Sequence, residues 1–133
     1  VTGRAVQTGE LEGEALALQL TWTASDPRLS GEVTRTVNFN FDPQSGNVID
    51  SHVYELVNDA GSWRGDGNGY TLDAFGDALS VQSVVLSGRD GYEGLSALVV
   101  LETATDAAGA IWDLQGVVFP AAVPELPEPR AAE

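Results

Sequence analysis

The sequence has no cysteine, no methionine and no lysine, and it has one histidine, His52. Without cysteine the chain has no disulfide framework, no thiolate nucleophile and no cysteine metal site. One histidine alone does not build a transition-metal site, so we expect no metal and no cofactor. No stretch approaches the roughly 18 consecutive apolar residues of a transmembrane helix. We therefore expect no membrane insertion.

Basic residues are scarce, because six arginines stand against 20 acidic residues and the net charge is −14. Such a chain repels phosphates and anionic lipid head groups, so nucleic acid is not an expected partner. A strongly acidic, soluble surface is common among secreted and halophilic proteins, and the absence of cysteine fits an exported bacterial protein. We expect a secreted or cell-envelope location.

The chain does contain a series of short β-forming segments separated by turn residues. The expected strands are Thr2–Gln7, Ala15–Ala24, Glu32–Asp42, Val48–Val57, Trp63–Thr71, Leu79–Leu86, Tyr92–Thr103 and Ala110–Phe119. About eight antiparallel strands joined by short loops favour an all-β, up-and-down barrel, because closure removes exposed sheet edges. A two-sheet sandwich is the alternative. We assign residues 1–119 to this single domain.

Residues 120–133 differ in character, because they hold four of the six prolines. A proline-rich segment of this kind reads as an extended, semi-rigid linker or tail. A frayed C-terminus is the alternative.

The stretch "SWRGDGNGY" (Ser62–Tyr70) suggests three familiar motifs. An adhesive RGD motif needs a protruding loop. A calcium-binding EF-hand loop that starts at Asp66 needs glycine at its sixth position, where Thr71 stands. A phosphate-binding glycine loop needs a helix after it, and we expect none here. The alternation of Trp63 and three glycines with polar residues instead predicts a strand. Glycines on one face of a strand mark coiling or a large neighbour covering the backbone. They are also a hint of an internal cavity.

His52 lies in "VIDSHVYEL" with Asp50 and Tyr54 at alternate positions, which a strand places on one face about 6–7 Å apart. If that face lines the interior, His52 could act as a general base, Asp50 could tune it, and Tyr54 could donate to a developing oxyanion. In the alternative, this face meets solvent and Ile49, Val53 and Val57 point inward.

Segment Glu32–Asp42 alternates most regularly and predicts an inward face that includes Arg35. The apolar members of this face are Val33, Val37, Phe39 and Phe41. A buried arginine needs a partner. One interpretation is a structural pair with a carboxylate such as Glu102 or Asp113, or a position at the barrel rim. The other is a cation that holds a carboxylate or enolate in the interior.

Large aromatic side chains are candidates for lining a ligand pocket. Those assigned to ligand binding, together with Asp50, are Phe39, Trp63, Tyr92 and Trp112. The alternative is that these rings belong to the core.

The meander of strands and the run "SGRDGYEGLSA" (Ser87–Ala97) resemble the allene oxide cyclase/dirigent type of small β-barrel. The pieces "SDPRLSG", "NDAGSW" and "GYEGLSAL" resemble those in uncharacterised secreted bacterial proteins of similar size. The resemblance implies a hydrophobic lumen that guides a reactive intermediate through cyclisation or isomerisation.

Two functions remain open from the sequence. In the first, the barrel binds an apolar small molecule in its lumen and acts as a cofactor-free cyclase or isomerase, with Arg35 as anion anchor and His52 and Tyr54 as proton-handling groups. In the second, the chain is an extracellular structural or adhesion module without catalytic activity. Self-association into a homodimer or trimer through an exposed apolar barrel face is a further hypothesis.

Overall fold

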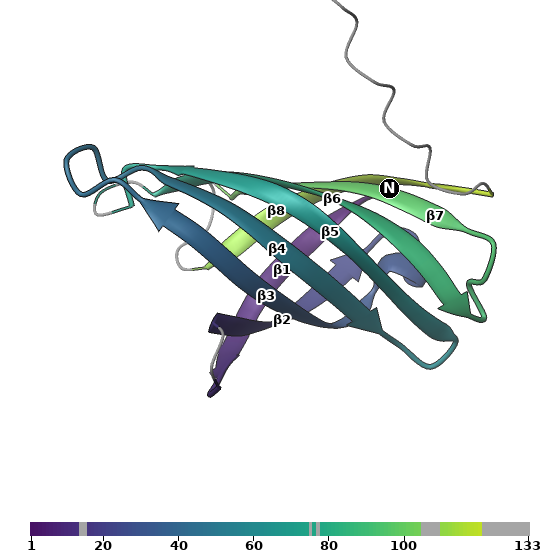
Figure 1. The fold of residues 1–133 in the computed structure, drawn as a ribbon. Coiled ribbons are helices and arrows are strands. Elements are labelled where there is room, and N and C mark those ends of the chain that lie inside the picture. Colours follow the sequence, from purple (N-terminus) through teal and green to yellow (C-terminus); the bar gives the residue numbers. More distant parts are fainter. Residues whose placement is uncertain (14–15, 75, 77, 105–109, 121–133) are drawn as a thin grey trace, which may run out of the picture.

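The computed structural model describes residues 1–13, 16–74, 76, 78–104 and 110–120. Eight antiparallel strands, each paired with the next and the last with the first, form one closed barrel (Figure 1). The strands are β1 (Thr2–Leu11), β2 (Leu16–Ala24), β3 (Gly31–Phe41), β4 (Val48–Val57), β5 (Gly61–Leu72), β6 (Leu79–Asp90), β7 (Ser96–Thr103) and β8 (Ile111–Phe119). The predicted up-and-down barrel is confirmed, and the sandwich alternative is wrong. Most of the predicted tail, residues 121–133, lies outside the described residues.

The predicted and observed strand boundaries differ at the reversal between β6 and β7. The sequence predicts a turn at "SGRDG" (Ser87–Gly91), but β6 continues to Asp90 and the chain reverses at Gly91–Leu95. The amide of Tyr92 donates to the Arg89 carbonyl at 3.1 Å, and that of Leu95 donates to the Tyr92 carbonyl at 3.0 Å. Tyr92 therefore belongs to the turn rather than to a strand.

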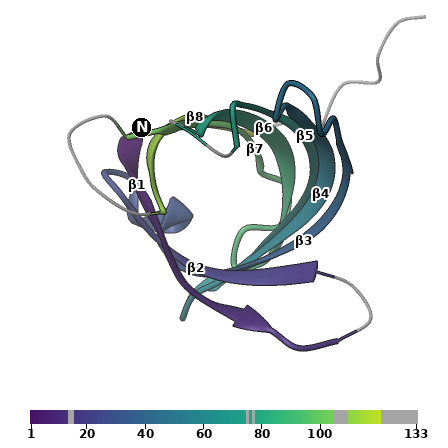
Figure 2. The same cartoon turned by 90° about the vertical axis from the view of Figure 1, so that its left-hand side faces the viewer.

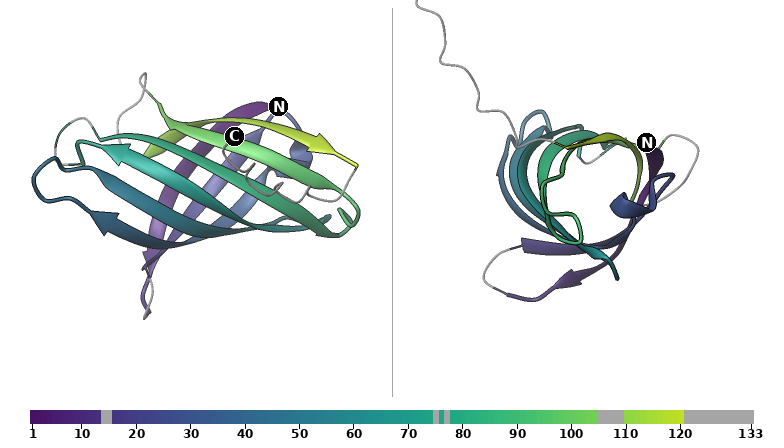
Figure 3. Two further views of the ribbon diagram at one scale, coloured as in Figure 1. Left: turned by 45° about the horizontal axis from the view of Figure 1, so that its top comes forward. Right: turned by 90° about the vertical axis from the view of Figure 1, so that its right-hand side faces the viewer.

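One end of the barrel is closed by packed side chains. A single 3-10 turn, η1 (Pro27–Leu29), curls into the ring of strands at this end (Figure 3). Leu29 is fully buried, and the indole of Trp63 on β5 donates to the Arg28 carbonyl at 2.9 Å. Leu29 belongs to one buried hydrophobic cluster with Ala5, Leu20, Trp22, Val33, Tyr54, Leu56, Trp63, Val84, Leu86, Tyr92, Ala97, Val99, Leu101 and Leu114. Side chains therefore fill the interior of this half of the barrel.

At the opposite end the barrel opens. Strands β1, β3, β5 and β7 end here and strands β2, β4, β6 and β8 begin here, and the view along the barrel shows the ring of strands (Figure 2). Phe39 and Phe41 lie on the inward face of β3 near this end, yet they are 50% and 39% exposed. The inward face predicted for β3 is confirmed at Val33 and Arg35, which are buried, whereas its last two aromatic residues stand at the rim and not in the core.

The outer surface of the barrel is mainly polar on one side and partly aliphatic on the other. Over β3 to β5 it is mainly polar, whereas over β6 to β8 it carries exposed aliphatic side chains: Val81, Leu98, Val100 and Val117. Among the described residues, no helix is long and apolar enough to cross a membrane.

Candidate ligand site in the barrel mouth

A layer of polar side chains crosses the lumen between the closed end and the mouth. Alternation along β4 turns Asp50, His52 and Tyr54 inward, and all three are at most 5% exposed. Arg35 reaches the same layer from β3 and Gln82 from β6. The alternative in which this face of β4 meets solvent is wrong, because Ile49 is 60% exposed and Val53 lies on the outer side with it.

Asp50 connects the two basic side chains of this layer. Its Oδ1 lies 2.8 Å from His52 Nδ1, and its Oδ2 lies 3.5 Å from Arg35 Nη2. Burial would raise the pKa of Asp50, but the hydrogen bond from His52 and the charge of Arg35 together hold that pKa below its ordinary value. Asp50 is thus an ionised carboxylate in the interior. It takes the place of the Glu102 or Asp113 partner expected for Arg35.

Gln82 connects Arg35 to Tyr54. The amide orientation that satisfies its neighbours turns the oxygen toward the guanidinium, where it accepts from Nη2 at 2.9 Å and Nη1 at 3.1 Å. The amide nitrogen then donates to the Tyr54 hydroxyl oxygen, and Ser80 Oγ donates to the amide oxygen at 3.3 Å. Burial raises the pKa of Tyr54 well above its ordinary value, an effect that nearby Arg35 opposes. Tyr54 therefore stays a neutral phenol.

The glycines of β5 explain how these side chains fit. Gly65, Gly67 and Gly69 all face the lumen, as the strand interpretation of "SWRGDGNGY" predicts. A Cβ on Gly67 would lie 2.7 Å from His52 Nε2, and one on Gly69 would lie 2.6 Å from Asp50 Oδ1. The space beside Gly67 and Gly69 is therefore occupied by His52 and Asp50. The internal cavity that these glycines suggest from the sequence does not lie next to them.

A cavity does exist at the mouth, outside the polar layer. It encloses about 370 Å³. Its lining consists of Gln7, Arg35, Thr71, Ala78, Ser80, Gln82, Thr103, Ala110, Ile111 and Trp112. Within the part of the chain that the structure describes, three buried N–H groups have no hydrogen-bond partner: Trp22 Nε1 in the core, Arg35 Nε and Trp112 Nε1. Two of these three donors belong to residues that line the cavity, Arg35 and Trp112.

The structure brings some of the predicted site residues together and separates others. Arg35, Asp50, His52 and Tyr54 form the polar layer, with Trp112 at the cavity and Phe39 at the rim. The other two aromatic candidates, Trp63 and Tyr92, lie at the closed end. Their rings stack with centroids 5.1 Å apart, and the Tyr92 hydroxyl donates to Asn58 Oδ1 at 2.8 Å. These two rings pack at the end of the barrel opposite the mouth.

Sequence reasoning missed Gln82 and Ser80. Strand β6 alternates Leu79 and Val81 on one face with Ser80 and Gln82 on the other, a pattern that predicts the two polar residues on the outside. Both are buried, at 7% and 4% exposure, while the two aliphatic residues are exposed. The signal that could reveal them lies further along the strand, where Val84 and Leu86 share the face of Gln82.

Within the described residues, no group of three or more histidine, aspartate and glutamate side chains is arranged to hold a metal ion. No protein-family model, no curated protein and no solved structure matches this chain. The geometry of the barrel is therefore the basis for a functional proposal, and the resemblance to the allene oxide cyclase/dirigent barrels stays a prediction.

Proposed function

We propose that the protein binds a small, largely apolar molecule with a hydrogen-bond acceptor in the mouth of its barrel. The observation that carries the proposal is the pair of buried, unpartnered donors, Arg35 Nε and Trp112 Nε1, from residues that line one cavity. A buried donor without an acceptor costs about 1–3 kcal/mol. A bound carbonyl or carboxylate would remove part of that cost.

The size and lining of the cavity support this ligand class. A volume of about 370 Å³ falls in the range of small-molecule pockets, about 300–1,000 Å³. Ile111 and the Trp112 ring offer apolar surface, while Arg35 and Gln82 lie at the inner wall. We infer that the acceptor end of the ligand points inward and that its apolar end faces the rim, where Phe39 is exposed.

The proposal extends to catalysis through the polar layer. An enolate formed in a cofactor-free cyclisation or isomerisation would gain stabilisation from the Arg35 guanidinium. His52 is enclosed, with Nδ1 on Asp50 and Nε2 3.4 Å from the Ser83 carbonyl, and the Tyr54 hydroxyl is held by Gln82. The geometry thus supports binding at Arg35 more directly than proton transfer by His52. In an assay of cyclisation or isomerisation, unchanged turnover by His52→Ala would remove His52 from the mechanism.

Native mass spectrometry of the purified protein, compared with its denatured mass, tests for a retained ligand. A titration followed by amide NMR then compares two probes of equal chain length, decanoate with an acceptor head and decylammonium with a donor head. We expect decanoate to shift the amide signals of Arg35, Gln82 and Trp112. Trp112→Phe, which keeps a ring but removes the donor, should weaken decanoate binding about threefold to tenfold.

Two results would overturn the proposal. One is that neither probe shifts signals at the mouth and native spectra show only the bare chain mass. The other is that both probes bind equally well and Trp112→Phe changes neither affinity. Either would favour the structural or adhesion module, the second function that the sequence leaves open. The secreted or envelope location stays a prediction from composition and is independent of this test.

A further inference from the structure

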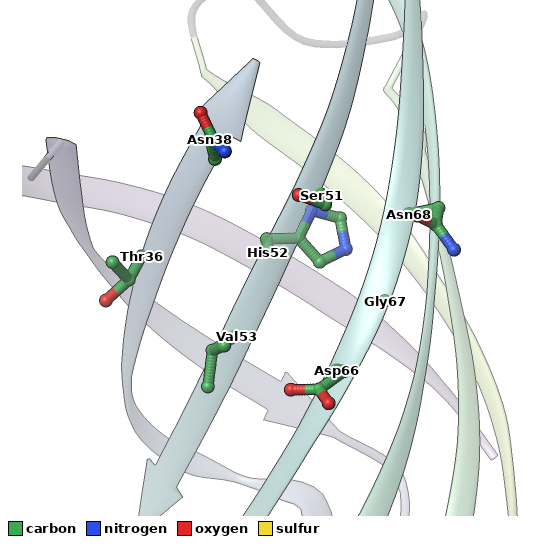
Figure 4. Close-up of a pocket in the computed structure, with 8 residues that line it drawn as sticks. All are labelled: Thr36, Asn38, Ser51, His52, Val53, Asp66, Gly67 and Asn68. Carbon is green, nitrogen blue, oxygen red and sulfur yellow. The ribbon is translucent and has the colours of Figure 1, made fainter.

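A second concave region lies on the outer side of the barrel wall. It is a shallow groove of about 440 Å³ that crosses β3, β4 and β5 (Figure 4). Its lining consists of Thr36 and Asn38 of β3, Ser51, His52 and Val53 of β4, and Asp66, Gly67 and Asn68 of β5. His52 and Gly67 face the lumen, so we refer to the other six residues, which lie on the outer face, as the outer groove. The barrel wall separates it from the mouth cavity.

The polar side chains of the outer groove are not occupied by contacts within the protein. Among the residues that the structure describes, the side chains of Thr36, Asn38, Ser51, Asp66 and Asn68 make no hydrogen bond or ion pair. Other polar side chains on the same sheet do pair, as Arg64 with Glu55 at 3.1 Å and Gln19 with Thr34 at 3.3 Å. The groove is thus a local concentration of free amide, hydroxyl and carboxylate groups.

The charge of the outer groove restricts its partner. Asp66 is the only charged residue among the six, although the chain carries 20 acidic residues. A phosphate or other anion finds no cation here, and one carboxylate is too little for a hard cation, which takes six or more oxygen ligands. A dry protein interface would bury the free amides without partners, which is costly. The groove therefore fits a neutral partner that is itself rich in hydroxyl groups.

The groove also offers apolar surface. Val53 of β4 lies between the polar side chains of β3 and β5. Next to the groove, toward the mouth, Ile49 and Tyr70 line a second concavity of about 300 Å³. Tyr70 is 42% exposed, so its ring is available to the C–H face of a sugar.

We propose that the outer groove binds a neutral oligosaccharide chain, which runs across β3 to β5 and continues onto Tyr70. Asn38 and Asn68 each offer a donor and an acceptor, matching the paired hydroxyls of a pyranose. Asp66 accepts from a further hydroxyl, and Val53 packs against ring C–H groups. This proposal does not depend on the ligand in the mouth, because the two sites lie on opposite sides of the barrel wall.

The test is an amide NMR titration with four neutral hexasaccharides at millimolar concentration: cellohexaose, maltohexaose, xylohexaose and chitohexaose. We expect at least one of them to shift the signals of Asn38, Ser51, Asp66 and Asn68, and to leave those of Arg35 and Trp112 in place. If none of the four shifts the groove signals, or if the shifts occur at Arg35 and Trp112, the proposal is wrong. The decanoate titration is unaffected by either result.

Single-site variants then assign the contact. Asn38→Ala and Asn68→Ala should each weaken the hexasaccharide about threefold to tenfold, since each removes neutral hydrogen bonds. Gln115→Ala, an amide truncation on the exposed outer face of β8, is the matched control and should leave the affinity unchanged. All three positions are exposed, so the fold is expected to persist. Equal weakening by Gln115→Ala and the groove variants would overturn the assignment.

Discussion

The imidazole Nδ1 of His52 lies 2.8 Å from Oδ1 of Asp50, two residues earlier on the same strand. This contact is possible because both side chains lie across the bare backbone of Gly67 and Gly69 on the next strand. Asp50 uses its other oxygen for Arg35 on the strand to the opposite side. One carboxylate thus links Arg35 of β3 to His52 of its own strand β4 inside the barrel, and it should matter more for stability than the many acids of the surface.

Replacing Asp50 with asparagine should destabilise the fold. The change removes the negative charge between two basic groups, leaves Arg35 buried without an ionic partner, and should lower the free energy of unfolding by about 3 kcal/mol. Urea denaturation followed by tryptophan fluorescence measures this change. Asp66→Asn, on the outer face, is the control and should change stability by less than about 0.5 kcal/mol. Equal effects of the two variants would contradict a structural role for the buried carboxylate.

The contribution of Asp50 should disappear in acid. Its pKa is lowered in the folded protein, whereas the unfolded value is about 3.9. Its stabilisation is therefore fully present above about pH 4 and is lost as the pH falls through the folded pKa, because protons bind the unfolded state first. The pKa values of Asp26 and Asp42 are also lowered, so acid sensitivity of the wild type alone is not specific.

The difference between wild type and Asp50→Asn isolates the effect of this carboxyl group. The gap between their unfolding free energies should be widest near neutral pH and should narrow steadily below about pH 4. A gap that stays constant down to the acid transition would mean that Asp50 is not charged in the folded state.

The lumen-facing glycines of β5 should not tolerate a side chain. A Cβ at Gly67 would meet the Ser83 carbonyl oxygen and would lie 2.7 Å from His52 Nε2, so Gly67→Ala should cost about 1–3 kcal/mol through overpacking. Gly9→Ala is a matched control on β1, where a Cβ would have no neighbour within 4 Å. It should leave stability unchanged or raise it by about 0.5 kcal/mol. Thermal unfolding of both variants measures these changes in stability. A Gly67→Ala variant as stable as the wild type would contradict the close packing.

Two tryptophans provide a comparison between the ends of the barrel. Trp63→Phe removes an indole that donates to Arg28 and stacks on Tyr92, so it should lower the free energy of unfolding by about 2 kcal/mol. Trp112→Phe removes a donor that has no partner among the described residues, and its cost should stay below about 1 kcal/mol. Denaturation measured without added ligand checks both values. The reverse order would contradict the distinction between a packed end and an open one.

The barrel itself could be predicted from the sequence, because eight segments with β-forming residues are separated by short turns. Segment Val48–Val57 coincides with β4, and the inward face of β3 follows from its regular alternation. The sequence misplaces the β6–β7 turn because Tyr92 and Leu95 are residue types typical of strands. In the structure Tyr92 is 6% exposed within a turn, so its burial comes from stacking on Trp63 and not from strand pairing.

The site was harder to predict, for a physical reason. Periodicity assigns the apolar face of a strand to the interior, and on β4 and β6 the interior face is the more polar one near the mouth. Asp50 and Gln82 are stable there because each finds a partner on another strand, at sequence separations that a single strand does not reveal. The identity of the arginine's partner was equally hidden, because the β3–β4 register places Arg35 opposite Tyr54 and the guanidinium reaches Asp50 by extending along the strands.

Leu29 and Trp63 fill the far end of the barrel, so in the part of the chain that the structure describes the lumen is closed at that end. A ligand of the proposed class would therefore enter and leave through the mouth. A ligand longer than the cavity would leave its apolar end at the rim, near Phe39, or in solvent. For a series of carboxylates, affinity should therefore rise with chain length only until the cavity is full, and the length at which it stops rising would measure the depth of the cavity.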